Sequence, residues 1–360
     1  MKVIMTGGGT GGHIYPAIAI ADEIKSRHPD AEIIFVGTER GMEKDIVPKA
    51  GYPIKFITVS GLNRKNPIKL IKTLKDLNHG LHEAKQIIKE FKPDLVIGTG
   101  GYVCGPVMKT AAGMGIKTYI HEQNAFPGLT NKLLSRGAER VFVAFDDAKK
   151  YFKTKKEPVT VGNPVRHAFT EVDRQAARES LGVKEDEFMV LSFGGSLGAQ
   201  RINDEMTVAA ERLRDRAGLR IFFVTGKRYY SSIMENADKT NARVTYLQYI
   251  DDMPKYLNAC DLAITRSGAL TVSEITACGR ASVMIPSPYV TNNHQYYNAK
   301  VVADRCGAIL IEEKDLTNGE VADEIEQLMN DRQILEKMEK ASAALGTVTS
   351  AGKICDIIGI

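Results

Sequence analysis

Short apolar runs alternate with amphipathic segments along the first half of the chain. The apolar runs are continuous over three to six residues, as in strands of a parallel sheet that is covered on both faces. They predict strands at residues 3–5, 32–37, 55–59, 94–98, 117–120 and 140–143. The segments between them carry apolar residues at helical spacing and predict helices at 14–21, 43–50, 67–91, 105–114 and 128–135. Regular alternation of strand and helix predicts an α/β domain.

A turn cluster, Val161-Gly162-Asn163-Pro164, interrupts this pattern, which then starts again. The second half predicts a helix at 199–216 and strands at 187–193, 220–225, 243–246, 262–265, 281–285 and 308–311. We therefore expect an α/β fold with two Rossmann-like, doubly wound parallel-sheet domains facing across a cleft, at 1–163 and 164–343. The turn cluster would be their hinge. The stretch from 331 is predicted to be helical, and we expect its end, about 344–360, to pack back on the first domain.

The composition is that of a soluble globular protein, with 43% hydrophobic and 26% charged residues. The net charge is +4, and nearly all of the excess lies within residues 61–92, which hold eight Lys or Arg against three Asp or Glu. Five cysteines lie far apart without a C-x-x-C pair, which suits a reducing cytosol. A strand directly after Met1 leaves no room for a signal peptide, and no apolar run reaches the ~20 residues of a membrane span.

A glycine-rich loop, residues 7–12, lies between the first strand and the first helix, which we expect to carry Pro16 in its first turn. Such a loop presents backbone N–H groups and a helix N-terminus to an anion. It also fits G-x-G-x-x-G, a weak match that does not identify the ligand. His13 follows the loop, where an imidazole is a candidate general base. The alternative is that His13 only caps or packs against the helix.

Four further polar segments are expected at carboxyl ends of strands. Residues 98–102 form a second glycine loop, and His121-Glu122-Gln123-Asn124 offers hydrogen bonds to a hydroxyl-rich ligand. The 194–198 loop, with Ser196, suits a diphosphate, and Glu274 at the end of the 266–274 segment suits the vicinal diol of a ribose. Each segment has a purely structural alternative: an ordinary turn, a helix cap or a solvent-facing acid.

Arg166 follows the hinge and is suited to a phosphate or a planar base, or to a structural ion pair. His294 and Gln295 add donors at the same end of the second sheet. The sequence has no Asp-x-Asp motif, so we expect neither a metal nor another cofactor. A diphosphate would then be neutralised by backbone dipoles together with Arg or Ser.

The basic stretch predicts an amphipathic helix whose apolar stripe is flanked by lysines. This pattern fits a helix on an anionic membrane surface, and the alternative is an ordinary crossover helix whose stripe faces the sheet and whose lysines are solvated. No aromatic platform accompanies the charges, which argues against a nucleic-acid partner. The residues of the candidate membrane surface are Ile68, Lys69, Ile71, Lys72, Leu74 and Lys75.

Taken together, these motifs resemble a family of bacterial glycosyltransferases that add N-acetylglucosamine (GlcNAc) to the lipid-linked peptidoglycan precursor. The resemblance covers essentially the whole chain, in order. It rests on residues 8–13, 98–102, 121–124, 162–166, 194–196 and 266–274. It implies the GT-B fold and an inverting transfer from UDP-GlcNAc to the 4-hydroxyl of MurNAc-pentapeptide on undecaprenyl diphosphate, converting lipid I to lipid II.

The resemblance also implies partners, a location and residue roles. The protein would lie peripherally on the cytoplasmic face of the cell membrane, at an anionic surface, with partners among the cell-wall-synthesis proteins. His13 would be the general base, Ile250 would offer backbone atoms to uracil, and Glu274 would hold the ribose. His294 departs from the Gln of some members. The residues implied to bind UDP-GlcNAc are Thr10, Gly11, Gly12, Asn124, Arg166, Ser196, Ile250, Ala269, Leu270, Thr271, Val272, Ser273, Glu274 and Gln295.

Two classes of alternative function are compatible with the glycine loops. One is another enzyme on the same scaffold, a diacylglycerol glycosyltransferase or a UDP-GlcNAc epimerase. The other is a dinucleotide-binding oxidoreductase or a non-catalytic nucleotide-binding regulator, in which Glu39 would hold a ribose.

Overall fold

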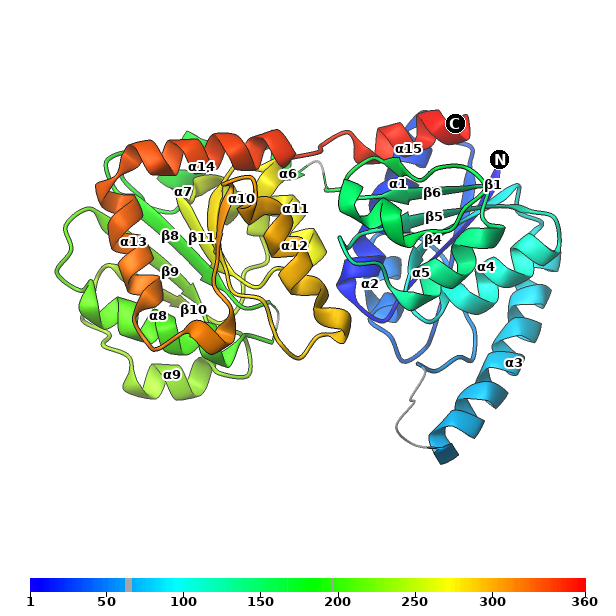
Figure 1. Ribbon diagram of the computed structural model, residues 1–360, viewed down its shortest axis with the longest axis horizontal. Helices are drawn as coiled ribbons and strands as arrows, with labels where there is room; N and C mark the ends of the chain where they lie inside the picture. The colour runs from blue at the N-terminus through cyan, green and yellow to red at the C-terminus, as the bar shows by residue number, and fades with distance from the viewer. Residues whose placement is uncertain (62–66, 167, 196) are drawn as a thin grey trace. The chain divides into compact units, whose positions relative to one another are not determined.

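The computed structural model describes residues 1–61, 67–166, 168–195 and 197–360, without the side chains of 67–72 and 74. Two compact units make up the chain (Figure 1). The first comprises Met1–Val165 together with Thr349–Ile360, and the second comprises Arg166–Val348.

A seven-stranded parallel sheet in the order β3-β2-β1-β4-β5-β6-β7 forms the centre of the first unit. Its strands are β1 (Lys2–Gly7), β2 (Glu32–Gly37), β3 (Ile54–Phe56), β4 (Leu95–Gly100), β5 (Lys117–Glu122), β6 (Arg140–Val143) and β7 (Val159–Thr160). The predicted strands are confirmed, whereas β7 was missed because two residues give no hydrophobic pattern. The order of strands reverses between β1 and β4, which is the position where ligands bind in such sheets.

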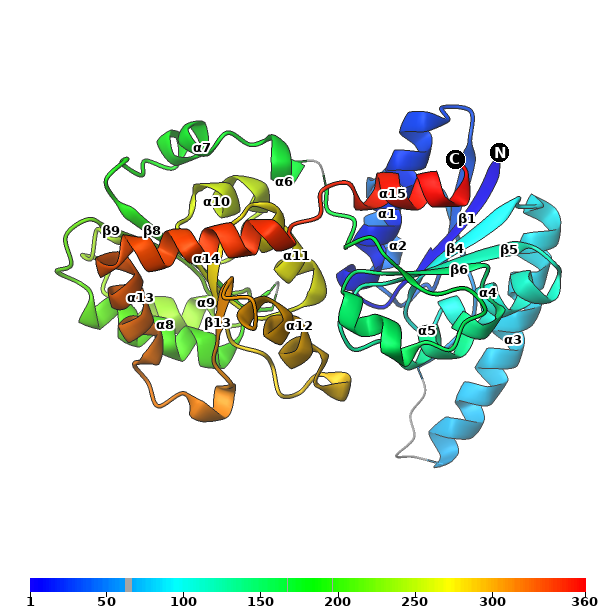
Figure 2. The same cartoon turned by 45° about the horizontal axis from the view of Figure 1, so that its top comes forward.

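Helices cover both faces of this sheet, so that alternate residues of a strand enter different cores (Figure 2). Val3 and Met5 of β1 pack toward α1 and α15, and Ile4 packs toward α3 and α4. The helices are α1 (Gly11–Arg27), α2 (Glu43–Lys49), α3 (Pro67–Phe91), α4 (Cys104–Gly113), α5 (Leu129–Leu134) and α15 (Ser350–Ile358), with 3-10 helices at Ser135–Gly137 and Asp146–Tyr151. Among the described residues, none of the helices has the length and apolar composition to cross a bilayer.

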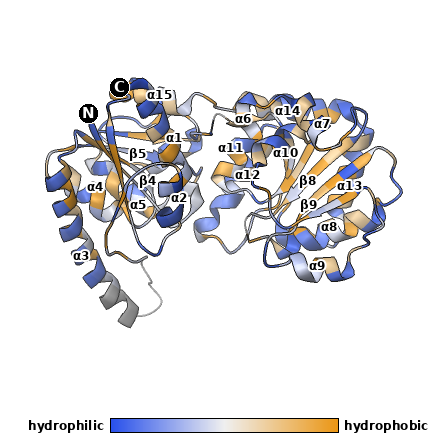
Figure 3. Ribbon diagram, turned by 180° about the vertical axis from the view of Figure 1, so that it is seen from behind, coloured by the Kyte–Doolittle hydropathy of each residue, from blue (hydrophilic) through white to orange (hydrophobic). Residues whose placement is uncertain are grey.

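The second unit is built on a six-stranded parallel sheet in the order β10-β9-β8-β11-β12-β13. Its strands are β8 (Phe188–Phe193), β9 (Leu219–Val224), β10 (Val244–Leu247), β11 (Leu262–Thr265), β12 (Ala281–Met284) and β13 (Ala308–Leu310). Figure 3 shows the apolar colouring concentrated in these strands. The predicted strands are again confirmed, and the order reverses between β8 and β11.

One face of this sheet packs on α8, α13 and α14 through Phe188 and Val190, while α10 contacts β8 and buries Leu257. The helices are α6 (Ala168–Glu171), α7 (Arg174–Ser180), α8 (Gln200–Arg212), α9 (Tyr230–Asn236), α10 (Met253–Ala259), α11 (Ala269–Ala277), α12 (His294–Ala303), α13 (Glu320–Asn330) and α14 (Arg332–Leu345), with 3-10 helices at Thr291–Asn293 and Glu313–Asp315.

Two helix predictions were wrong in detail. The first helix begins at Gly11, so Pro16 lies in its second turn and deprives the Gly12 carbonyl of its usual helical donor. The last stretch is not continuous, because α14 ends before Gly346 and α15 begins only at Ser350. Gly346 packs against the backbone of Thr276, where an added Cβ would lie 2.5 Å from the carbonyl oxygen.

The C-terminal helix α15 packs on α1 and belongs to the first unit. Ile354 and Cys355 are fully buried in the core that α1 shares with the sheet. Arg27 at the end of α1 donates to the Asp356 carboxylate and, at 2.9 Å, to the Ile360 carbonyl. The chain terminus is thus fixed by apolar burial and by a charged clamp.

A buried carboxylate stabilises the second unit. Asp261, directly before β11, accepts hydrogen bonds from Arg174 (2.8 Å), Arg178 (3.2 Å) and the Met189 N–H (2.7 Å). Asp261→Ala would leave the buried Arg178 guanidinium without its counter-charge, so we expect a loss of about 3–5 kcal/mol in the free energy of unfolding. Calorimetry should show the melting temperature of this unit falling by roughly 10 °C.

The matched control for this substitution is Asp323→Ala, which removes an exposed ion pair with Arg212. It should cost at most about 1 kcal/mol, because exposed pairs contribute little. Equal melting temperatures for the two variants would contradict the structural role of Asp261.

Candidate active site

The carboxyl ends of β1 and β4 bring the two glycine loops of the first unit together. The Gly8 N–H donates to the Gly100 carbonyl at 3.3 Å. Gly101 has φ +85°, and a Cβ there would lie 2.3 Å from the Gly8 carbonyl oxygen. Only glycine therefore allows this approach, which places the start of α1 at the reversal point of the sheet.

A buried carboxylate that the sequence analysis missed also fixes the glycine loop. Glu43, in the first turn of α2, accepts the Gly9 N–H at 2.9 Å, and it also accepts the Thr38 N–H (2.9 Å) and hydroxyl (2.7 Å). The Gly9 N–H is therefore occupied by the protein itself. Within the described residues, the N–H groups of Gly11 and Gly12 at the start of α1 have no protein acceptor and are available to an anion. The only sequence signal for Glu43 was an acid shortly after a strand.

His13 lies in the first turn of α1, and its ring is partly buried. Its Nδ1 is 3.1 Å from the Thr99 carbonyl oxygen and 2.9 Å from Gln123 Oε1. Both atoms only accept hydrogen bonds, so Nδ1 carries the proton of the neutral ring and Nε2 carries the lone pair. In the described part of the chain, no residue bonds to Nε2. This tautomer, with an unprotonated Nε2, is the one that a general base needs.

The polar residues 121–124 mainly hold neighbouring loops in place. β5 continues through His121 and Glu122, and both side chains are buried together with Gln123. Glu122 accepts hydrogen bonds from the backbone and side-chain amides of Asn124 (2.9 and 3.1 Å) and from Asn131 Nδ2 (2.9 Å). Three of the four residues hold neighbouring loops, which is the structural alternative given for this segment. Asn124 is the partly exposed member.

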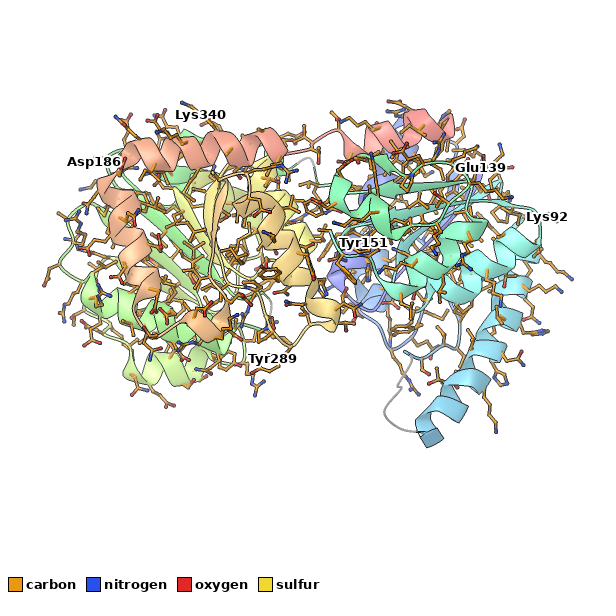
Figure 4. The ribbon with its side chains drawn as sticks, viewed as in Figure 1. Lys92, Glu139, Tyr151, Asp186, Tyr289 and Lys340 are labelled. Carbon is orange, nitrogen blue, oxygen red and sulfur yellow. The ribbon has the colours of Figure 1, made fainter. Side chains whose placement is uncertain are left out.

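A cavity of about 1000 Å³ opens in the second unit where β8 and β11 end. Gln295 lines it, and its Oε1 accepts the Ser287 N–H at 2.8 Å. Tyr289, on the loop after β12 (labelled in Figure 4), also lines the cavity and is 91% exposed. The other lining residues are Gly194, Gly195, Leu197, Gly198, Ala199, Gln200, Arg201, Asp204, Tyr229, Arg266, Pro286, Ser287, Pro288, Val290, Asn293, Glu312, Glu313 and Lys314.

The cavity combines a glycine loop at the start of α8 with a guanidinium. Arg266 donates to the Ile285 carbonyl (3.0 Å) and to Glu313 (2.5 Å), which fixes its plane at the wall. Gly198 has φ +82°, and a Cβ there would lie 2.2 Å from the Thr225 carbonyl oxygen. A closely packed loop, a helix start and a guanidinium form the kind of site that suits a diphosphate.

The start of α11 provides unoccupied backbone groups. Gly268, its N-cap, has no side chain to occupy the first N–H groups. Val272 is fully buried, and the Ser273 hydroxyl donates to the Ala269 carbonyl at 2.9 Å. A ligand at this helix end would therefore meet main-chain N–H groups together with the partly exposed side chains of Leu270 and Thr271.

Glu274 lies in the second turn of α11 and is partly buried. Burial raises the pKa of its carboxyl to about 7, against the opposing effect of the Arg166 guanidinium. Arg166 also lies over the Phe169 ring, 5.1 Å from its centroid. Glu274 and Arg166 thus interact, although neither lines the cavity described above.

The remaining predicted residues are placed as follows. Ile250 is buried, which leaves its backbone as its means of contact. Ser196 lies outside the described residues, as do the side chains of Ile68, Lys69, Ile71, Lys72 and Leu74; Lys75 is exposed on α3. Within the described ranges, no group of three or more His, Cys, Asp or Glu side chains is arranged to hold a metal ion.

Known proteins resemble this chain over both units. The model of the glycosyltransferase family 28 N-terminal domain matches residues 3–143, and that of the family 28 C-terminal domain matches 189–353. The UDP-N-acetylglucosamine--N-acetylmuramyl-(pentapeptide) pyrophosphoryl-undecaprenol N-acetylglucosamine transferase of Alkaliphilus oremlandii is 47% identical, covering 98% of this chain and 97% of its own. The same-named protein of Acetivibrio thermocellus is 46% identical, covering 99% and 97%. The crystal structure of Acinetobacter baumannii MurG is 31% identical, with a TM-score of 0.81 over 99% of both chains.

Proposed function

Because the chain belongs to the family of UDP-N-acetylglucosamine--N-acetylmuramyl-(pentapeptide) pyrophosphoryl-undecaprenol N-acetylglucosamine transferases, we propose that it transfers GlcNAc from UDP-GlcNAc to lipid I, forming lipid II. The enzyme is a glycosyltransferase of family 28. The proposal for its site depends on one observation. The two hydrogen bonds of Nδ1 leave the lone pair of the His13 ring on Nε2, at the carboxyl end of β1.

The first unit would bind the acceptor. The N–H groups of Gly11 and Gly12 and the start of α1 suit the diphosphate of a lipid-linked sugar. Nε2 of His13 would take the proton of the attacking 4-hydroxyl. The imidazolium so formed would be stabilised by two hydrogen bonds from Nδ1–H, to Thr99 and Gln123.

The second unit would bind UDP-GlcNAc. The diphosphate would lie at the glycine loop before α8 and at the start of α11, with Arg166 nearby, the ribose at Glu274 and the uracil at the backbone of Ile250. Gln295 would contact the sugar. As the hydroxyl attacks the anomeric carbon, the bond to UDP breaks and the configuration inverts. Peptide dipoles would stabilise the charge that develops on the leaving UDP.

UDP release from UDP-GlcNAc, measured with and without a short-chain lipid I analogue, tests this function. We expect release to depend on the analogue and the disaccharide product to be β-linked. Release without the analogue, or a product epimerised at the sugar, would favour the alternative enzymes. The relatives that match over the full length carry the transferase name and do not favour those alternatives.

We also propose that the enzyme lies peripherally on the cytoplasmic face of the membrane, where its lipid-linked acceptor is held. The support is α3, a 25-residue helix with a basic N-terminal half and the exposed Lys75. Replacing Lys69, Lys72 and Lys75 by Glu should abolish most binding to anionic vesicles, since each lysine near such a surface contributes about 1 kcal/mol. Co-sedimentation with the vesicles measures this binding.

The matched control replaces Lys85, Lys89 and Lys92, in or just after the last turns of the same helix, by Glu. It changes the net charge equally and should retain vesicle binding. Equal loss in both variants would mean that net charge alone attracts the protein, and retention in both would contradict the proposed surface.

A further inference from the structure

Four groups of the first unit form a series of hydrogen bonds that ends at His13. The geometry of this series determines which nitrogen of the His13 ring carries the proton. The series runs from the Gly162 carbonyl through His121 and Gln123 to Nδ1 of His13. Only its last group lies where it could meet a substrate. Gln123 is 1% exposed and His121 is fully buried.

The orientation of the Gln123 amide follows from its neighbours. One end of the amide is 3.0 Å from the His121 carbonyl oxygen, which only accepts, so that end is the NH₂ group. The other end is therefore Oε1, and it faces Nδ1 of His13 at 2.9 Å. The backbone of Gln123 is held as well, since Asn163 Nδ2 donates to its carbonyl at 3.1 Å.

The protonation of His121 agrees with this orientation. Its Nε2 is 2.9 Å from the Gly162 carbonyl oxygen and must donate, so Nδ1 accepts from the Gln123 NH₂ group at 3.0 Å. Burial lowers the pKa of His121 to about 4, so the ring is neutral near pH 7 and carries the one proton that this pattern needs. Gly162 has φ +83°, a conformation that suits glycine.

We propose that Gln123 is a positioning residue, which together with the Thr99 carbonyl keeps the proton of His13 on Nδ1 and the lone pair on Nε2. His121 and Gly162 act one step further away, by fixing which end of the amide faces the ring. A reversed amide would present N–H to Nδ1 and favour the tautomer whose Nε2 is already protonated. The inference rests on the proposed function only through the base role of His13.

Other ionisable side chains near the His13 ring form hydrogen bonds with other residues. Glu122 on β5 accepts from Asn124, Gly128 and Asn131, and Glu43 on α2 accepts from Gly9 and Thr38. Tyr102 lies beside the glycine loop and Thr38. None of them bonds to the ring in the described structure, so a changed pH profile in a Gln123 variant reports on the Gln123 contact.

The direct test is ¹⁵N NMR of histidine-labelled wild-type enzyme near pH 8, with the His13 signals assigned by their absence in His13→Ala. We expect a pyrrole-like Nδ1 and a pyridine-like Nε2. The reverse pattern would overturn the inference. This measurement needs no turnover, so its outcome is separate from that of the transfer assay.

Kinetics give the second test. Gln123→Met should lower kcat about 10- to 100-fold and leave the Kd of UDP-GlcNAc within twofold, because a hydrogen bond to a developing imidazolium is lost. Gln123→Glu should move the acid limb of the pH–rate profile up by about 1 unit, because a carboxylate stabilises the imidazolium. An acid limb that stays in place in Gln123→Glu would show that the side chain at position 123 does not bond to the His13 ring, and that result would overturn the inference.

Thr118→Val is the matched control, since Thr118 is a buried polar residue at the other end of β5. It should leave kcat and the pH profile unchanged. If Gln123→Met does not fold, the wild-type spectrum still decides the tautomer.

Discussion

His13→Ala is expected to lower kcat by about 10²- to 10⁴-fold, the usual contribution of a general base. The Kd of UDP-GlcNAc should stay within twofold of the wild-type value, since the ring lies in the first unit and the proposed donor site lies in the second. The measurements are UDP release with a lipid I analogue at saturation and calorimetric titration with UDP-GlcNAc.

His28→Ala is the matched control, because His28 is exposed at the other end of α1. It should turn over at the wild-type rate. If His13→Ala also retained the wild-type kcat, another group would have to accept the hydroxyl proton, and the proposed mechanism would be wrong at that step.

Glu274→Ala is expected to weaken UDP-GlcNAc binding by roughly 10- to 100-fold at pH 8.5, where the carboxylate is ionised. The reason is that a charged acceptor of two ribose hydroxyls contributes about 1.5–3 kcal/mol. Titration with UDP-GlcNAc and with UDP should show similar losses, because both ligands carry the ribose. Glu324→Ala, which removes a partly buried acid on α13, is the matched control and should bind as the wild type does. An unchanged affinity in Glu274→Ala would exclude the ribose contact.

The same carboxyl makes the stability of the ligand-free protein depend on pH. Burial raises its pKa from 4.5 to about 7, so the folded state holds its proton more tightly than the unfolded state does. This stabilising contribution is complete below about pH 4.5 and is lost as the pH rises through about 7. Glu274→Gln has no titrating carboxyl at this position and therefore does not lose that contribution. The melting temperature of the variant minus that of the wild type should rise by a few degrees between pH 5 and pH 8.

The hydrophobic pattern was sufficient to predict the two parallel sheets, because strands buried on both faces are continuous apolar runs. The order of the motifs along the chain was sufficient to identify the family. The pattern failed where the signal was short or ambiguous, as in the two residues of β7 and the true start of α1. Two glycines before His13 concealed a helix that begins at Gly11.

The site was predicted less completely than the fold. The sequence drew attention to residues 121–124, but it could not separate a ligand contact from a support. Only the fold shows that Glu122 holds Asn124 and that Gln123 holds His13. The sequence marked Glu43 only as an acid shortly after a strand and could not show its partner Gly9, which lies 34 residues away.

The sequence by itself determined the elements and their order, because periodicity, turn chemistry and glycine loops act over a few neighbouring residues. Only the tertiary structure decided which helix of the first unit α15 packs on, which of the loop N–H groups remain available, and which nitrogen of His13 holds the proton. Each of these depends on hydrogen bonds or packing between residues far apart in the chain. Such contacts exist only after the sheets have brought those residues together.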